Sequence, residues 1–290
     1  MMTRPRLFVP PGYAALALRT PTLPPAAHTN CYIVGTREAI VVDPGSPYPG
    51  EQELLARHLY RLLGRGGSLH GVFLTHHHRD HVGGALALAR TFDVSVLAHA
   101  RTFAQLAQER RWRRLLSTFD LETIDEGAAL RVDEGFRKLR VMHTPGHAVG
   151  HLCLFESTGL ARGTLLAGDM IPGAGTTLID PHEGDMAQYV ASLRRLAALD
   201  VARVLPAHGP FRMPARPLIA RLIAHREARE ARIVSALALT PRPLEVITRE
   251  AYADLSPVSL PLALRTCLAH LHALRRGGRV RWSRGAWALA

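Results

Sequence analysis

Seven consecutive residues concentrate the chemistry-bearing side chains of this sequence. Residues 75–81 read Thr-His-His-His-Arg-Asp-His, directly after the apolar residues 71–74 and before residues 82–85, which open a helical pattern. A turn between a strand and a helix directs several imidazoles and a carboxylate into one hollow at the end of a sheet. A histidine tag would lie at a chain end and would not carry an aspartate in register. The segment therefore predicts a metal site.

Three further fragments supply the same kinds of ligand, each after an apolar stretch. They are His143-Thr-Pro-Gly-His147, Ala-Gly-Asp169 and Pro-Ala-His208-Gly. A lone histidine or aspartate at a strand end is more often a cap or a satisfied polar contact, so each fragment alone is weak. Together the four segments indicate a centre built from imidazole and carboxylate. Such ligands without thiolate suit divalent metals, zinc first, with manganese or iron as alternatives.

The elements that must position these residues predict a mixed α/β domain. Apolar runs predict strands at residues 39–42, 72–74, 94–97, 139–142, 151–155, 164–167 and 201–205. Apolar residues at helical spacing predict helices at residues 51–63 and 185–199. Each ligand-bearing fragment thus begins where a predicted strand ends.

The character of the chain changes after the last ligand fragment. Residues 217–239 predict a long helix, and a break at residues 240–243 leads to helical stretches at 244–255 and 260–275. Two short strands follow, at residues 279–282 and 286–289. Helix, helix and hairpin is the order of a winged helix. We therefore expect a catalytic domain over residues 1–215, and a linking helix with a winged-helix-like domain over residues 216–290.

The histidine-rich segment resembles the H-x-H-x-D-H motif of the metallo-β-lactamase-fold hydrolases. Residues 29–35 and 42–45 are similar to the opening strands and turn of that family. The resemblance implies an αβ/βα sandwich with two metal ions. It assigns His76, His78 and His147 to one ion, Asp80, His81 and His208 to the other, and Asp169 to both.

The tail narrows the resemblance to the β-lactamase-like protein 2 branch. The similarity rests on residues 175–180, 184–186, 189–193, 206–210 and 225–227, and on the terminal winged helix. Animal members of that branch are described as endoribonucleases, and relatives include acyl-carrier thioesterases. The resemblance implies a metal-dependent hydrolase of phosphodiesters, with single-stranded RNA as the favoured partner. The alternative is a thioesterase or other acyl hydrolase, glyoxalase II-like, on a small anionic or acyl substrate.

In a two-metal site, ions about 3.5–4 Å apart share a hydroxide, which is the expected nucleophile. Two dications, two aspartates and that hydroxide leave about one positive charge, which favours an anionic substrate or a developing oxyanion. Asp80 is expected to accept a hydrogen bond from the hydroxide and orient it, which makes Asp80 the predicted catalytic residue. We expect no ligand role for His77, and roles in positioning other groups for His143 and His151.

Composition fits this interpretation. The chain has 290 residues, 47% of them hydrophobic, which is enough for a large core. Three scattered cysteines predict no disulfide framework, and no apolar run approaches the ~18 residues of a membrane span, so we expect a cytoplasmic protein. The net charge of +12 permits nucleic-acid binding, but 35 of the 36 basic residues are arginine, which is typical of a GC-rich genome. A non-catalytic winged-helix nucleic-acid binder is the weakest alternative. Neither the residues that contact substrate nor the oligomeric state follows from the sequence.

Overall fold

The structure is a computed structural model that describes residues 5, 7–24, 26–238, 240–256 and 260–290. The chain divides into two compact units. The first contains residues 1–144, 150–175 and 200–215, and the second contains residues 145–149, 176–199 and 216–290. The expected division between residues 215 and 216 stays a prediction.

One sheet of the first unit combines antiparallel and parallel strands. Its order is β1 (Tyr13–Arg19), β2 (His28–Val34), β3 (Glu38–Val42), β4 (Ser68–Phe73), β5 (Val96–Ala98) and β6 (Leu121–Thr123). From β3 to β6 neighbouring strands are parallel, so each connection must cross over, and helices make the crossings. These helices are α1 (Pro49–Leu63), α2 (Arg79–Val82), α3 (Ala85–Phe92), α4 (Ala100–Leu106) and α5 (Arg110–Leu116).

The other sheet of this unit is mostly antiparallel. Its order is β11 (Arg203–Pro206), β10 (Thr164–Gly168), β9 (Leu152–Thr158), β8 (Arg137–His143) and β7 (Ala129–Val132). Only the β10 and β11 pair is parallel among these neighbours. The carboxyl ends of β10 and β11 therefore point in the same direction. Asp169 follows the first of these ends and His208 follows the second.

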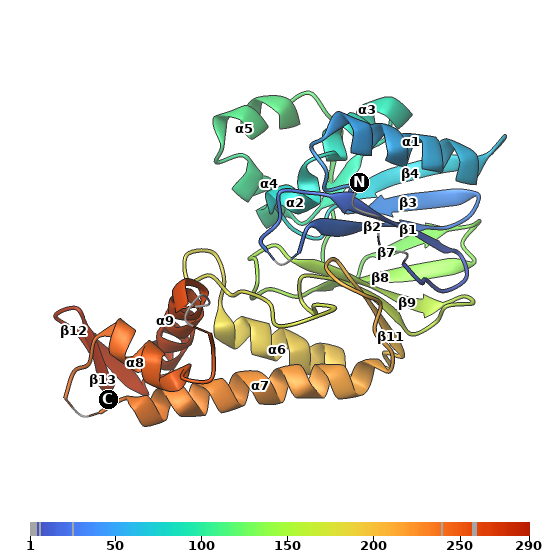
Figure 1. Ribbon diagram of the computed structural model, residues 1–290. Coiled ribbons are helices and arrows are strands. Elements are labelled where there is room, and N and C mark those ends of the chain that lie inside the picture. The colour runs from blue at the N-terminus through green and yellow to red at the C-terminus, as the bar shows by residue number, and fades with distance from the viewer. Residues whose placement is uncertain (1–4, 6, 25, 239, 257–259) are drawn as a thin grey trace. The chain divides into compact units, whose positions relative to one another are not determined.

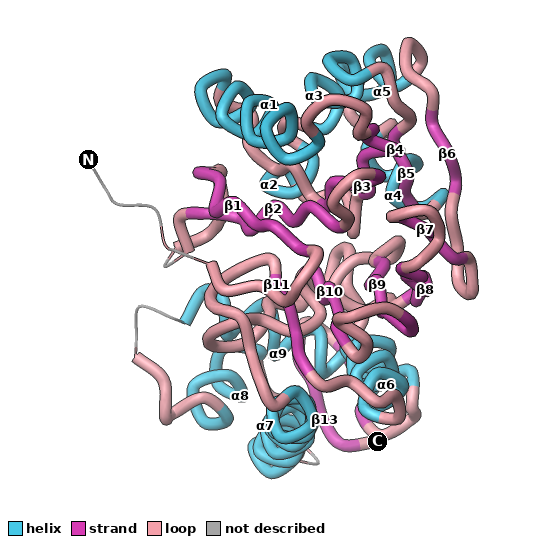
Figure 2. Tube along the Cα trace, turned by 90° about the vertical axis from the view of Figure 1, so that its right-hand side faces the viewer, coloured by secondary structure: helices cyan, strands magenta, loops and turns pink. Residues whose placement is uncertain are grey.

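Strand alternation divides the apolar side chains of the first sheet between two cores. Ile33 and Val41 pack with Leu55 of α1 in the core beneath the helices. Their neighbours on the strands, such as Val34 and Val42, pack with residues of the second sheet. Figures 1 and 2 show α1 and α3 on one side of the first sheet and the second sheet on the other. The first sheet is therefore buried on both faces.

The second unit contains the C-terminal helices. Its elements are α6 (Met186–Ala197), α7 (Ala215–Ala236), α8 (Leu244–Ala251), α9 (Leu260–Arg276), β12 (Val280–Ser283) and β13 (Ala286–Leu289). Ile233, Ile247, Leu271 and Trp287 bring α7, α8, α9 and the hairpin into one apolar core. The order of helices and hairpin is the one expected from the sequence, although α7 ends at Ala236 and Leu239 lies outside the described residues. The winged-helix assignment stays a prediction.

Candidate metal centre

The predicted ligands of the first unit lie where strands end. β4 ends at Phe73, and the turn after it carries His76 and His78 into α2, which holds Asp80 and His81. Asp169 directly follows β10, and His208 follows β11 by two residues. The strands fix where each loop begins, so side chains far apart in sequence come to one region of the unit.

Two glycines allow the close approach of these loops. A Cβ atom on Gly45 would lie 1.7 Å from the carbonyl oxygen of Asp80, so the chain after β3 packs directly on the turn that bears the ligands. Gly168 has a φ of +49° and would place a Cβ 2.5 Å from Nε2 of His151. His151 in turn accepts a hydrogen bond from the backbone N–H of Asp169 at 3.1 Å. His151 therefore positions the Asp169 loop, which is the kind of role expected for it.

Asp80, His81 and His208 form one donor group. Each offers a ligand atom, and these atoms lie within 4.8 Å of one another. Nε2 of His208 is 3.3 Å from Oδ2 of Asp80, and its Nδ1 lies 3.0 Å from the carbonyl oxygen of His28. Because Nδ1 donates to that carbonyl, Nε2 is the ring nitrogen with a free lone pair for a metal.

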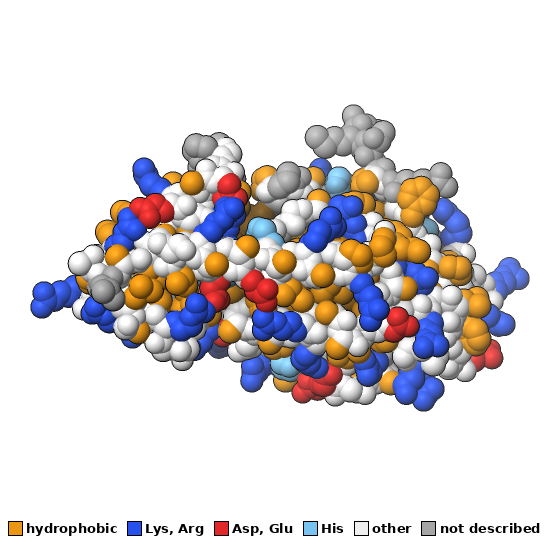
Figure 3. All heavy atoms as spheres, turned by 90° about the horizontal axis from the view of Figure 1, so that it is seen from below, with side chains coloured by type: hydrophobic (Ala, Val, Ile, Leu, Met, Phe, Trp, Pro, Cys, Tyr) orange, Lys and Arg blue, Asp and Glu red, His pale blue; other side chains and the backbone are white. Residues whose placement is uncertain are grey.

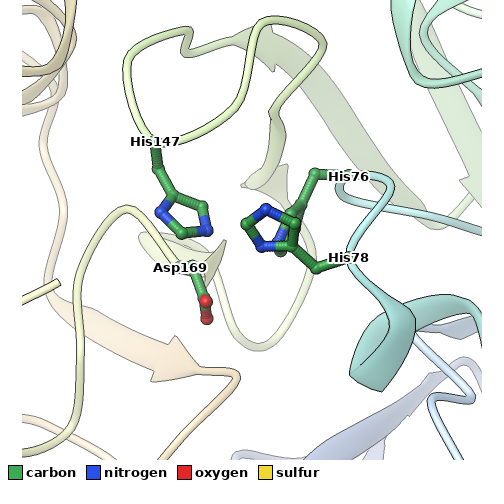
Figure 4. A group of neighbouring side chains, drawn as sticks. All are labelled: His76, His78, His147 and Asp169. Atoms are coloured by element: carbon green, nitrogen blue, oxygen red, sulfur yellow. The ribbon is translucent and has the colours of Figure 1, made fainter. Parts of the chain in front are cut away.

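His76, His78, His147 and Asp169 form a second donor group, again with ligand atoms within 4.8 Å of one another. Figure 4 shows the three imidazoles and the carboxylate gathered around one space. His147 lies on a short loop, residues 145–149, that belongs to the second unit. There Nδ1 of His147 lies 2.9 Å from the carbonyl oxygen of Leu178, which leaves Nε2 as the metal-binding nitrogen.

Asp169 connects the two groups. Its Oδ1 is 3.6 Å from Nε2 of His81 and 3.5 Å from Nε2 of His208, and it also belongs to the group around His76. All seven predicted ligands therefore fall into two neighbouring clusters. His77 belongs to neither of them. His143 stacks on His99 with ring centroids 4.4 Å apart.

Asp43 is a functional residue that the sequence analysis did not single out. Its carboxylate accepts hydrogen bonds from the backbone N–H and the hydroxyl of Thr75, at 2.8 and 2.7 Å. It also lies 2.8 Å from Nδ1 of His81 and is buried. A buried aspartate that holds a ligand ring fixes its tautomer and direction. The one sequence signal for Asp43 is its place in the Asp-Pro-Gly turn after β3. Its partner His81 lies 38 residues further along the chain.

The residues fit metal ions, and His81 provides the test. When the ring is neutral and Nδ1 donates to Asp43, Nε2 is the unprotonated nitrogen, and this buried atom has no hydrogen-bond partner among the described residues. It faces Asp80 at 4.0 Å and Asp169 at 3.6 Å, and a metal ion between these groups would bind the lone pairs of all three. Mixed imidazole and carboxylate donors are those that zinc and similar divalent metals prefer.

The electrostatics of the centre favour positive charge. Burial works to lower the pKa of His81, but the carboxylates of Asp169, Asp43 and Asp80 outweigh it and hold this pKa well above its usual range. Burial likewise opposes the ionisation of Asp80, yet the neighbouring His81 and His208 keep the pKa of this carboxyl below its usual range. Asp80 is therefore a carboxylate at neutral pH.

Comparison with known proteins gives the family of this fold and site. Residues 24–208 match the family described as the metallo-beta-lactamase superfamily. The chain belongs to this superfamily. It has the mixed α/β fold of that superfamily, as the sequence predicted. No described helix is long and apolar enough to cross a bilayer.

This chain spans between about half and nearly all of the length of the curated relatives that it matches. The lactamase-like protein vrtG of Penicillium aethiopicum is 34% identical over 72% of this chain, which spans 61% of that protein. The beta-lactamase-like protein 2 homolog of Drosophila melanogaster is 28% identical over 89% of this chain and 86% of its own. The thioesterase pkgB of Emericella nidulans is 33% identical over 73% of this chain and 54% of its own. The predicted similarity to the β-lactamase-like protein 2 branch is confirmed.

Solved structures share the fold. A beta-lactamase domain protein from Burkholderia ambifaria superposes with a TM-score of 0.81 at 25% identity, over 98% of this chain and 93% of its own. A metallo-beta-lactamase family protein from Thermus thermophilus gives a TM-score of 0.75 at 24% identity, over 97% and 99% of the two chains.

Proposed function

We propose that this chain is a binuclear metal-dependent hydrolase of acyl thioesters. The observation that carries the proposal is the pair of donor clusters joined by Asp169. His76, His78 and His147 would hold one ion, Asp80, His81 and His208 the other, and Asp169 both. Two such ions, when bound, activate water and polarise a carbonyl or phosphoryl oxygen. Zinc is the proposed metal, with manganese or iron as alternatives.

The residues of the chain have separate roles in this proposal. Asp80, ionised at neutral pH, is the group placed to accept a hydrogen bond from the attacking water or hydroxide and to orient its lone pair. Asp43 and the carbonyl oxygen of His28 hold His81 and His208 in the tautomers that leave Nε2 for metal. These contacts are made within the chain, so the ligand rings are held in place without help from substrate.

Two observations favour a thioester as substrate. Among the relatives, pkgB of Emericella nidulans is named a thioesterase, and a protein of Passalora fulva, 29% identical over 72% of this chain, is named atrochrysone carboxyl ACP thioesterase. Within the second unit, three arginines near the C-terminal helices and hairpin, which could otherwise contact phosphates, already pair with carboxylates. They are Arg265 with Asp180, Arg276 with Asp185, and Arg279 with Glu230.

A phosphodiester, with single-stranded RNA as the polymer, is the second candidate. The net charge of +12 favours it, because guanidinium groups pair with phosphates. On the face in Figure 3, however, arginine side chains are scattered among acidic and apolar ones and form no single stripe.

A substrate panel distinguishes the two candidates. The metal-loaded full-length chain is incubated with an acyl-CoA series, acyl-pantetheine, single-stranded RNA and single-stranded DNA, with Asp80→Asn as the inactive control. The proposal predicts thioester hydrolysis that Asp80→Asn reduces by orders of magnitude. Cleavage of RNA by the wild-type chain with no thioester hydrolysis would overturn the choice of substrate and favour the second candidate.

A further inference from the structure

The motif at residues 225–227 lies on α7 in the second unit, and the proposed chemistry gives it no role. Its arginine, Arg226, is 2% exposed and has no carboxylate partner in the part of the chain that the structure describes. A buried charge without such a partner costs free energy unless other groups satisfy it. The groups that Arg226 does contact therefore indicate what it does.

Arg226 contacts two residues that lie beside the surroundings of the metal ligand His147. One of its terminal nitrogens donates a hydrogen bond to the carbonyl oxygen of Thr177. Its guanidinium carbon also lies 5.2 Å from the centre of the Tyr189 ring on α6, which is a cation–π contact. Arg226, Thr177, Tyr189 and the loop of residues 145–149 all belong to the second unit. These contacts therefore connect α7 to the surroundings of His147 within one compact unit.

The contact with Thr177 acts on the carbonyl that orients the His147 ring. Leu178 follows Thr177, and its carbonyl oxygen lies 2.9 Å from Nδ1 of His147. Residues 176–180 form neither a helix nor a strand, so no regular backbone hydrogen bonding fixes the direction of these carbonyls. The carbonyls of Thr177 and Leu178 belong to planar peptide groups that share the Cα of Leu178. A Thr177 carbonyl released from Arg226 therefore lets the Leu178 carbonyl turn away from His147.

The contact with Tyr189 acts on the loop that bears His147. Gly146 packs on the backbone of Tyr189, where a Cβ on Gly146 would lie 2.3 Å from the Tyr189 nitrogen. The carbonyl oxygen of Gly146 also accepts a hydrogen bond from the backbone N–H of Asp185, just before α6, at 2.7 Å. Arg226 covers the ring of the same tyrosine. The guanidinium thus supports both the residue before His147 and the carbonyl that holds the His147 ring.

We propose that Arg226 is a positioning residue for the metal ligand His147, although it lies on α7 and is not a ligand itself. The inference rests on the proposed metal centre. His147 presents Nε2 to a metal while its Nδ1 donates to Leu178. Groups that orient a metal-binding ring in this way typically contribute about 10- to 100-fold to metal affinity. Because Arg226 acts through one further contact, we expect its removal to cost about tenfold.

The zinc affinity of the full-length chain tests this inference, with chelator competition resolving the two ions. The variant is Arg226→Met, and the control is Arg229→Met on the same helix. Arg229 is 5% exposed and lies over the ring of Tyr252 at 4.1 Å, but it pairs with Asp254 at 2.9 Å. Both changes remove a buried arginine that lies over a tyrosine ring. Only the first removes a contact beside the surroundings of His147.

We expect Arg226→Met to weaken the binding of one zinc ion about tenfold, and Arg229→Met to leave both affinities unchanged, although both variants lower the melting temperature. Hydrogen–deuterium exchange of the metal-free chain gives a second readout. The backbone amides of residues 145–149 and 176–180 should exchange faster in Arg226→Met and not in Arg229→Met. A merely structural role of Arg226 would lower the melting temperature without these differences.

Arg226→Lys keeps the charge and a donor, so it should lose less zinc affinity than Arg226→Met. Where Arg226→Met does not fold, Arg226→Lys and Arg229→Lys provide the same comparison. Equal zinc affinities in the matched Arg226 and Arg229 variants would overturn this inference alone. A wild type that binds no zinc would overturn the proposed metal centre as well.

Discussion

At the scale of single residues, Asp43 holds a ligand ring without being a predicted ligand itself. Asp43→Asn is expected to weaken metal binding by about 10- to 100-fold, because a neutral amide no longer holds Nδ1 of His81 as a donor. Asparagine tolerates the φ of +51° at this position, so the backbone is kept. Chelator competition measures the affinity, and Asp200→Asn, an exposed site, is the control. Wild-type affinity in Asp43→Asn would show that Asp43 only stabilises the turn.

The types of the ligands can be predicted from the sequence, but their orientation cannot. The histidines and aspartates of the centre stand in a short motif and at predicted strand ends, and the four segments together indicate a metal. The contact of Asp43 with His81 joins residues 38 positions apart and depends on how β3 and β4 pair. A local sequence pattern does not reveal a contact between such distant residues, so Asp43 could not be predicted to orient His81.

At the scale of elements, most buried apolar runs are predictable as strands, but β1, β6 and β7 at the sheet edges are not among the predicted strands. The predicted strand at residues 139–142 lies inside β8, and residues 164–167 lie inside β10. β6 and β7 have three and four residues, mostly exposed, so neither shows the apolar pattern that predicts a strand. Their pairing comes from neighbouring strands, which a single sequence does not reveal.

Gly45→Ala tests how closely the chain after β3 and the ligand turn must pack. The new methyl group would lie 1.7 Å from the carbonyl oxygen of Asp80, so the turn must move, at a cost of about 1–3 kcal/mol. We expect a lower melting temperature and reduced metal content. Gly50→Ala, which meets nothing within 4 Å, is the matched control and should be neutral or stabilising. Equal behaviour of the two variants would contradict the close packing of this turn.

At the scale of the whole chain, its many arginines do not share one purpose. Several pair with carboxylates within the second unit, whereas Arg137 is buried in the first. Its guanidinium donates to Glu156 at 2.9 Å and to the carbonyl oxygen of Pro11, and the hydroxyl of Tyr13 donates to the same carboxylate at 2.6 Å. This network joins the segment before β1 to β8 and β9. The net charge alone therefore says little about nucleic acid.

Arg137→Met should lower the free energy of unfolding by about 3–5 kcal/mol, because it leaves Glu156 buried without its cation. Arg57→Met, which breaks an exposed pair with Glu53 on α1, should cost about 0–1 kcal/mol. Denaturant unfolding of both variants gives the comparison. Similar losses in the two would mean that the buried network does not hold these strands.

The central claim is that this chain holds two metal ions in the clusters joined by Asp169. Metal analysis of the full-length chain, loaded with zinc and freed of excess by gel filtration, tests it most directly. We expect about two ions per chain, falling to one or fewer in His208→Ala because the cluster around Asp80 loses a ligand. A zinc content near zero in the wild type, or one that His208→Ala leaves unchanged, would contradict it.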